Sequence, residues 1–133
     1  MMVKFPESLI DLVKPETKAM AFLALVKGDG KPQVTPIWFD FDGEYFIFNT
    51  ARGRVKDRIM KKKPVVAFVI MNLSEPYRYM QVSGPVVVET EDGAEDQIKD
   101  LSMKYHGHRN FTISPGEVRV TYKVFPEKVF PDS

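Results

Sequence analysis

The sequence predicts a mostly β protein, a six-stranded antiparallel barrel with two or three short helices that cover it. Six runs of apolar or alternating residues have the length of a strand. Turn signals that contain Gly or Pro separate several of these runs at hairpin spacing. The chain of 133 residues is long enough to bury a real core, so we expect a single domain over residues 1–133.

Composition excludes several classes of protein. The chain is 44% apolar and 28% charged, which is typical of a globular domain and not of a disordered one. It has no cysteine, which removes disulfides, thiolate chemistry and Cys-based zinc sites and fits a reducing compartment. We find no secretory signal and no apolar run of membrane-spanning length, so we expect a cytoplasmic protein with no membrane partner.

The first third of the chain predicts one helix and two strands. A short amphipathic helix is expected ahead of Pro15, because three apolar residues fall on one helical face. The continuous apolar run Met20–Val26 predicts a strand that is buried on both faces. A Gly-Asp-Gly turn signal over residues 28–31 leads to a second strand over residues 33–39. Pro36 cannot donate to a ladder, so this strand is expected at a sheet edge or bulged.

The middle of the chain predicts three strands and a basic helix. Residues 45–48 are apolar on both faces, as a barrel strand that is also covered on its outside requires. A helix follows, in which Val55 and Ile59 form one inward apolar stripe. The run Val65–Met71 predicts another buried strand, and a long strand is expected over residues 77–88.

The last third predicts a kinked strand end, a helix and a half-exposed strand. The long strand is expected to kink at Gly84, which precedes a proline. Asp92 and Glu95 have capping-box spacing ahead of a helix that Gly107 closes. Residues 118–124 alternate apolar and polar side chains, so this final strand is expected to have one face in water.

One segment concentrates the positive charge of the chain. Between residues 51 and 63 there are seven cations and one Asp, a local charge of +6 in a chain whose net charge is +1. The cations follow a Gly-bearing corner and a helix start, where free backbone N–H groups favour a phosphate or another compact anion. A solvated basic helix face would give the same pattern. These cations are Arg52, Arg54, Lys56, Arg58, Lys61, Lys62 and Lys63.

Four stretches of the chain resemble one known family in the family's own order. They cover residues 30–39, 50–56, 76–84 and 104–108. The sequence resembles the pyridoxamine 5′-phosphate oxidase-like proteins, which bind flavin or deazaflavin, over roughly residues 7–129. The resemblance implies a six-stranded antiparallel split β-barrel of the FMN-binding type. It also implies a homodimer with two cofactor sites across the subunit interface.

The same resemblance implies which residues hold the cofactor. Arg54 and Lys56 would bind its phosphate, with a hydroxyl from Thr50, and this agrees with the charge pattern of the corner. The strand around Pro36 would lie along the ring, and two residues of the long strand would reach the ring from the partner chain. The complete set of expected cofactor-binding residues is Thr35, Pro36, Ile37, Trp38, Thr50, Arg54, Val55, Lys56, Tyr79 and Gln81.

Departures from the family pattern narrow the expected activity. The Arg- and His-bearing C-terminal segment of true pyridoxamine phosphate oxidases is missing, so the vitamin-B6 reaction itself is not expected. The corner and the Tyr77-Arg78-Tyr79 strand look most like the branch that depends on coenzyme F420, with FMN as the other candidate cofactor. We therefore expect a reductase that transfers hydride to a small organic substrate. A flavin or haem carrier without turnover is the alternative, because it would use the same binding residues.

Other candidate groups are weaker. Residues Arg52, Arg58 and 61–63 would meet the polyglutamate tail of coenzyme F420 or simply face solvent. His106 and His108, without a nearby Cys or carboxylate group, are better explained as a polar helix end than as a metal site. We find no convincing acid–base residue: Tyr77 or Tyr79 could donate a proton, but such tyrosines are more often packing residues. The basic helix lacks the interleaved aromatics of a nucleic-acid surface. No metal and no nucleic-acid partner is expected.

Overall fold

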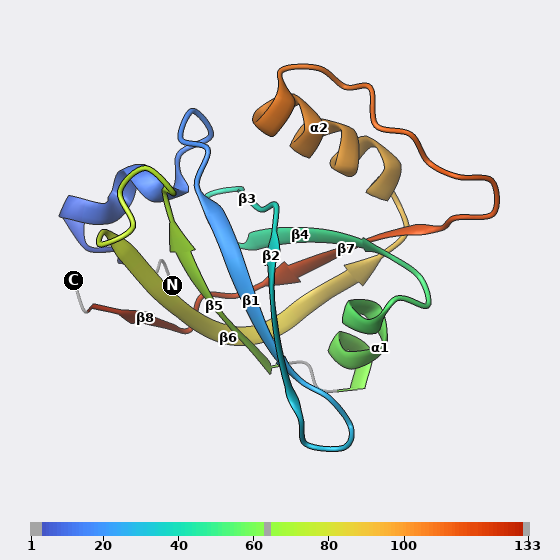
Figure 1. Cartoon of the computed structure of the whole chain (residues 1–133), viewed down its shortest axis with the longest axis horizontal. Coiled ribbons are helices and arrows are strands. Elements are labelled where there is room, and N and C mark those ends of the chain that lie inside the picture. The colour runs from blue at the N-terminus through green and yellow to red at the C-terminus, as the bar shows by residue number, and fades with distance from the viewer. Residues whose placement is uncertain (1–3, 63–64, 132–133) are drawn as a thin grey trace.

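The computed structural model describes residues 4–62 and 65–131. Its eight strands form one curled antiparallel sheet in the order β2-β1-β5-β6-β7-β4-β3, with β8 paired to β6 (Figure 1). The elements are η1 (Glu7–Val13, a 3-10 helix), β1 (Met20–Val26), β2 (Pro32–Ile37), β3 (Asp40–Phe41), β4 (Phe46–Ala51), α1 (Val55–Lys62), β5 (Val65–Met71), β6 (Tyr79–Thr90), α2 (Ala94–His106), β7 (Arg119–Val124) and β8 (Lys128–Phe130).

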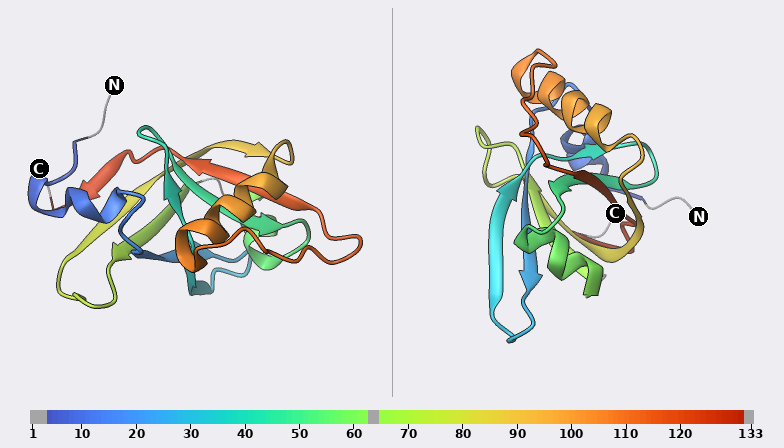
Figure 2. Two further views of the ribbon diagram at one scale, coloured as in Figure 1. Left: turned by 90° about the horizontal axis from the view of Figure 1, so that it is seen from above. Right: turned by 90° about the vertical axis from the view of Figure 1, so that its right-hand side faces the viewer.

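The predicted fold class is confirmed: the protein is mostly β, and its sheet curls into a half-barrel with short helices against it (Figure 2). The six longest strands are the six predicted from the sequence. The two additional strands, β3 and β8, span two and three residues, too few for a periodic pattern. β2 lies at the edge of the sheet and pairs only with β1, as Pro36 required.

Strand β6 joins the two halves of the sheet. Its first half pairs with β5 up to Pro85, and its second half pairs with β7 from Val86, with a register shift before Val88. Gly84 lies at this change of partner, where a Cβ atom would come within 1.8 Å of the carbonyl oxygen of Phe125. A glycine is therefore required where the chain after β7 crosses β6.

η1 and α1 contribute side chains to the core of the half-barrel, while α2 packs outside this core. The core contains aromatic residues from four strands, and η1 covers one end of it with Leu12 and Val13. α1 packs against β1 and β4 through Ile59 and Met60, while α2 packs on β7 and β4. None of the described helices is long and apolar enough to cross a membrane.

Two local predictions are wrong, the first because of a tertiary contact. The strand over residues 118–124 has no face in water, because α2 packs on its polar side and leaves Arg119 and Thr121 each 4% exposed. The capping box is also absent: α2 begins after Gly93, whose φ is 73°, with no side-chain cap. The predicted stop at Gly107 is confirmed, with a φ of 79° and its N–H donated to the carbonyl of Met103.

The outer face of the sheet is only half-buried. β1 and β5 were expected to be buried on both faces, but in each strand every second side chain is partly exposed. Phe22 pairs with Val69, and Val69 pairs with Gln81, so all three lie on this outer face. In contrast β4 is buried along its whole length, as predicted. The half-barrel therefore carries an apolar outer face made by β1, β2, β5 and β6.

Candidate cofactor-binding site

The candidate site begins at the corner between β4 and α1. β4 ends at Ala51, and Gly53 adopts a φ of 88°, a left-handed conformation that only glycine adopts without strain. The N–H of Arg54 then donates to the carbonyl of Ala51 at 3.2 Å, and α1 starts at Val55. This tight turn brings the buried end of a core strand next to the first turn of a basic helix.

A pocket of about 520 Å³ lies against this corner, in the opening of the half-barrel. Its walls come from the inward side of β2, the end of β4 and the start of α1. Among the described strands, β2 and β4 do not pair with each other, so the pocket occupies the gap that splits the barrel. The lining residues are Gln33, Ile37, Asn49, Thr50, Gly53, Arg54, Val55, Lys56 and Arg58.

The pocket carries positive charge that the protein itself does not neutralise. Among the described residues, no carboxylate lies within ion-pair distance of Lys56, and Arg54 has only Glu117, at 4.0 Å. Burial and then the nearby guanidinium of Arg54 lower the pKa of Lys56. Val55 and Lys56 are the first two residues of α1, so their N–H groups have no acceptor within the helix. Cations, helix dipole and free N–H groups together favour an anion here.

Polar groups of β4 and β2 form the inner wall of the pocket. Thr50 is 5% exposed and presents a hydroxyl at the strand end. Asn49 is held in place: its amide donates to the carbonyl of Ala94 at 2.9 Å, and its carbonyl accepts from Nε of Arg119 at 2.9 Å. The buried Oε1 of Gln33 has no hydrogen-bond partner among the described residues. The inner wall therefore offers a ligand the hydroxyl of Thr50 and Oε1 of Gln33, while the side chain of Asn49 is already bound by α2 and β7.

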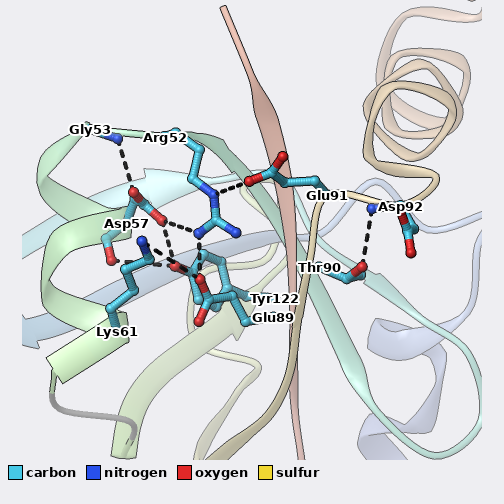
Figure 3. A network of polar contacts seen from close by, with 9 residues as sticks. All are labelled: Arg52, Gly53, Asp57, Lys61, Glu89, Thr90, Glu91, Asp92 and Tyr122. Atoms are coloured by element: carbon cyan, nitrogen blue, oxygen red, sulfur yellow. Dashed lines mark hydrogen bonds and ion pairs between the residues drawn. The ribbon is translucent and has the colours of Figure 1, made fainter.

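Arg52 does not belong to this set, although it is next to it in sequence. Its guanidinium donates to Asp57 at 3.0 Å, to Glu91 at 2.9 Å and to Glu89 (Figure 3). Lys61 also lies 4.0 Å from Glu89. The prediction that Arg52 meets an anionic tail or faces solvent is wrong, because three carboxylates bind it. Lys63, another of the expected cations, lies outside the described residues.

The structure brings five of the ten predicted site residues into the pocket. These are Ile37, Thr50, Arg54, Val55 and Lys56. Thr35 lies on the same inward side of β2, while Pro36 lies on the outer face, where it pairs with Phe22. Trp38 follows the strand and stacks on Tyr105 of α2 at 5.2 Å between ring centroids.

Tyr79 and Gln81 lie away from the pocket, on the outer face of β6. Tyr79 is 42% exposed and lines a separate hollow with Tyr77 and Phe130. Tyr79 and Gln81 therefore do not line the pocket of their own chain. Their approach to the cofactor from a partner chain stays a prediction.

The rings of His106 and His108 contact each other, and His106 also contacts an aromatic ring. His106 packs edge-on against Trp38 at 5.0 Å, and the two histidine rings stack at 5.7 Å. In the described part of the chain, no three His, Cys, Asp or Glu residues are grouped as metal ligands. His108 also accepts a hydrogen bond from the N–H of Asn110 at its Nδ1.

Sequence reasoning missed three residues of the site. Asn49 and Gln33 line the pocket, but they lie in strands whose sequence pattern indicates packing only. Asp57, which binds Arg52 and the N–H of Gly53, is the one acid in the basic segment. An acid in the first turn of a helix is a helix-start signal, and that pattern identifies Asp57 from sequence.

Comparisons with known proteins agree with this geometry. The family model described as pyridoxamine 5′-phosphate oxidase matches residues 13–130. A solved structure named F420 reductase is similar at 33% identity with a TM-score of 0.81, and the match covers 94% of this chain and 98% of that one. No curated protein matches.

Two more distant structures share the fold alone. One is the FAD and haem binding protein from Mycobacterium smegmatis, at 16% identity and a TM-score of 0.68, covering 95% of this chain and 70% of that one. The other is General Stress Protein 26 from Bacillus anthracis, at 18% identity and a TM-score of 0.69, and the match covers 92% of this chain and 89% of that one. The family model spans nearly the whole half-barrel, including the corner and the pocket. The chain therefore belongs to the pyridoxamine 5′-phosphate oxidase family.

Proposed function

We propose that this protein is an oxidoreductase that binds a phosphate-bearing flavin-type cofactor, coenzyme F420 or FMN, and reduces a small organic substrate. The observation that carries the proposal is the pocket at the β4–α1 corner. There Arg54, Lys56 and Thr50 lie together beside a helix start, and among the described residues no carboxylate lies within ion-pair distance of Lys56. The similarity to a structure named F420 reductase supports the deazaflavin as the first candidate.

The donor set fits a phosphate group. A guanidinium binds two phosphate oxygens at once, an ammonium adds a point charge, and a hydroxyl and helix N–H groups complete the shell. Burial and then repulsion from Arg54 lower the pKa of Lys56, and an anion between the two cations offsets that repulsion. When bound, the ring of such a cofactor supplies the hydride, so the chain has to hold the group, orient it and exclude water.

The outer face of the sheet supports a homodimer in which each pocket is completed by the partner. Phe22, Val69 and Met71 lie on this face and are only half-buried in one chain. Tyr79 and Gln81 share the face and pair with the same row. Burying this apolar face against a second copy carries Tyr79 and Gln81 toward the ring in the partner's pocket.

Fluorescence titration of the purified protein with coenzyme F420 and with FMN tests the cofactor. Tight binding of F420 alone supports a deazaflavin reductase, and preference for FMN supports a flavin reductase. If neither cofactor binds, the corner is a solvated basic helix face and the proposal is wrong.

A carrier that binds the cofactor without turnover is the second candidate, because one structure of this fold is named as an FAD and haem binding protein. Reduced cofactor bound to the protein is mixed with quinone and nitroaromatic acceptors, and its absorbance is followed. Protein-dependent oxidation supports the reductase. Tight cofactor binding with no acceleration by the protein supports the carrier.

A further inference from the structure

The acidic network around Arg52 divides the cations of the corner into two groups. Glu89 and Glu91 from the end of β6, together with Asp57 of α1, bind Arg52 (Figure 3). The neighbouring Arg54 and Lys56 keep one carboxylate at 4.0 Å and none, respectively, among the described residues. Within this short segment Arg52 stabilises the fold, whereas Arg54 and Lys56 remain available to a ligand.

Asp57 is the residue on which this network converges. Its Oδ2 accepts the N–H of Gly53 at 2.9 Å. Its Oδ1 accepts the hydroxyl of Tyr122 at 2.6 Å and Nη1 of Arg52 at 3.0 Å. The residue is 2% exposed, and Tyr122 in β7 is fully buried. Burial alone raises the pKa of Asp57, but the hydrogen bonds from Tyr122, Gly53 and Arg52 outweigh it, so the pKa lies below its usual range.

These bonds fix the piece of backbone that carries the ligand cations. The bond between Asp57 and Gly53 closes a loop of five residues in which Arg54 and Lys56 are the second and fourth. The bond to Tyr122 anchors the loop to β7, and Arg52 anchors it to the end of β6. The loop is therefore tied to two core strands from its inner side.

We propose that Asp57 is a positioning residue for the phosphate site: it holds the loop from Gly53 to the start of α1 so that Arg54, Lys56 and the free helix N–H groups converge on one anion. The inference rests on the proposed function, because it assigns a role in the same pocket. Asp57 itself does not contact the ligand, since both of its oxygens are engaged by the protein.

A simple charge effect and a positioning effect have opposite signs here. The carboxylate of Asp57 is a negative charge close to a site for a negative ligand, so removing that charge alone strengthens phosphate binding. If Asp57 instead positions the loop, removing the carboxylate weakens phosphate binding, because Arg54 and Lys56 no longer converge. The direction of the change in affinity separates the two roles.

The test is Asp57→Asn, measured with two pairs of ligands that differ in the phosphate. One pair is FMN and riboflavin, and the other is coenzyme F420 and its phosphate-free deazaflavin chromophore. We expect the phosphate-bearing member of the pair that binds to lose about tenfold in affinity. The phosphate-free member keeps its affinity, because the loop does not hold the ring.

The matched control is Asp42→Asn, at the opposite end of β4. Asp42 also accepts two backbone N–H groups, from Glu44 and Tyr45, and lies 3.4 Å from Nζ of Lys123. The substitution removes the same charge and the same kind of turn bond, but outside the pocket. We expect it to leave the affinity ratio within each ligand pair unchanged. If the affinity for the phosphate-bearing ligand relative to its phosphate-free partner falls as far in Asp42→Asn as in Asp57→Asn, the proposal is overturned.

If Asp57→Asn does not fold, Tyr122→Phe decides the question. It removes one hydroxyl from the network and leaves every charge in place, and we expect a smaller loss for the phosphate-bearing ligand alone. Unchanged or tighter phosphate binding in the folded variant overturns the positioning role while the phosphate site stands. A wild-type protein that binds both members of each pair equally overturns the phosphate site itself.

Discussion

The pocket at the β4–α1 corner and the outer face of the sheet are both incomplete in a single chain, but in different ways. The pocket is polar and holds Lys56 without a counter-charge among the described residues. The outer face is apolar and holds Phe22 and Val69 without cover. One region therefore calls for an anion and the other for an apolar surface. This difference underlies the proposal that a cofactor completes the first region and a second copy of the chain completes the second.

β2 links the two regions because its side chains alternate between them. Gln33 and Ile37 face the pocket, while Val34 and Pro36 face outward with Ala24 and Phe22 as their paired neighbours. A strand at a sheet edge with one side on each region can couple cofactor binding to dimer formation. Substitutions in one region at a time separate the two roles.

The largest effect is expected at Gly84, where β6 changes partner and joins the two halves of the sheet. In Gly84→Ala the new Cβ would lie 1.8 Å from a backbone carbonyl oxygen, and backbone cannot move aside as a side chain can. We expect a loss of more than about 3 kcal/mol in the free energy of unfolding, measured by urea denaturation. Gly28→Ala is the control, since nothing lies within 4 Å of its Cβ position. Equal stability of the two variants would contradict the close crossing.

The second effect tests the outer face alone. Val69→Glu places a charge in the middle of the apolar row, so a dimer buried there should weaken by at least about a hundredfold. Light scattering after size exclusion measures the mass, and the variant should run as a monomer. Met103→Glu changes an apolar residue on α2, away from the outer face and 48% exposed, and should not alter the mass. A Val69→Glu dimer as stable as the wild type would remove the outer face as the interface.

The sequence predicted the elements of both regions better than it predicted what surrounds them. The apolar runs gave the bounds of β1 and β5 to the residue, because a strand that packs on a core has a local pattern. The cation cluster located the pocket for a similar reason, since seven cations occur in one short segment. What surrounds these elements in space could not be read in the same way.

The failures have one physical source, which is long-range contact. Arg52 looked like its neighbours, but its partners Glu89 and Glu91 are 37 and 39 residues away along the chain. The polar side of β7 was predicted to be exposed to solvent, because nothing local in the sequence indicates that α2 covers Arg119. Patterns specify which residues are apolar or charged, and topology decides what they meet.

The third effect is a pH dependence in the pocket. Burial and the charge of Arg54 lower the pKa of Lys56 below the usual 10.5, and a bound phosphate raises it again. The complex therefore binds more protons than the free protein, so affinity for the phosphate-bearing cofactor falls as pH rises through the lowered pKa. Lys56→Arg stays charged and should remove this fall. Titrations across alkaline pH measure it, and an identical fall in both proteins would place the titrating group elsewhere.

The smallest effect is expected at the exposed rim of the acidic network. In Glu91→Gln one exposed partner of Arg52 loses its charge, while Asp57 and Glu89 keep the guanidinium in place. We expect a change in unfolding free energy of less than about 0.5 kcal/mol and no change in cofactor affinity. Thermal unfolding and fluorescence titration check both. A large loss of affinity would mean that the rim, rather than Asp57, holds the corner.

The central claim is that Arg54 and Lys56 bind the phosphate of the cofactor, and the most direct test is the double variant Arg54→Ala/Lys56→Ala. Its dissociation constants for coenzyme F420 and FMN are compared with those for the phosphate-free chromophores. Lys14→Ala/Lys18→Ala, which removes two exposed cations elsewhere, is the control for charge. We predict a loss of at least about a hundredfold for the phosphate-bearing cofactor alone, with the fold intact. An unchanged dissociation constant in the folded double variant would contradict the account.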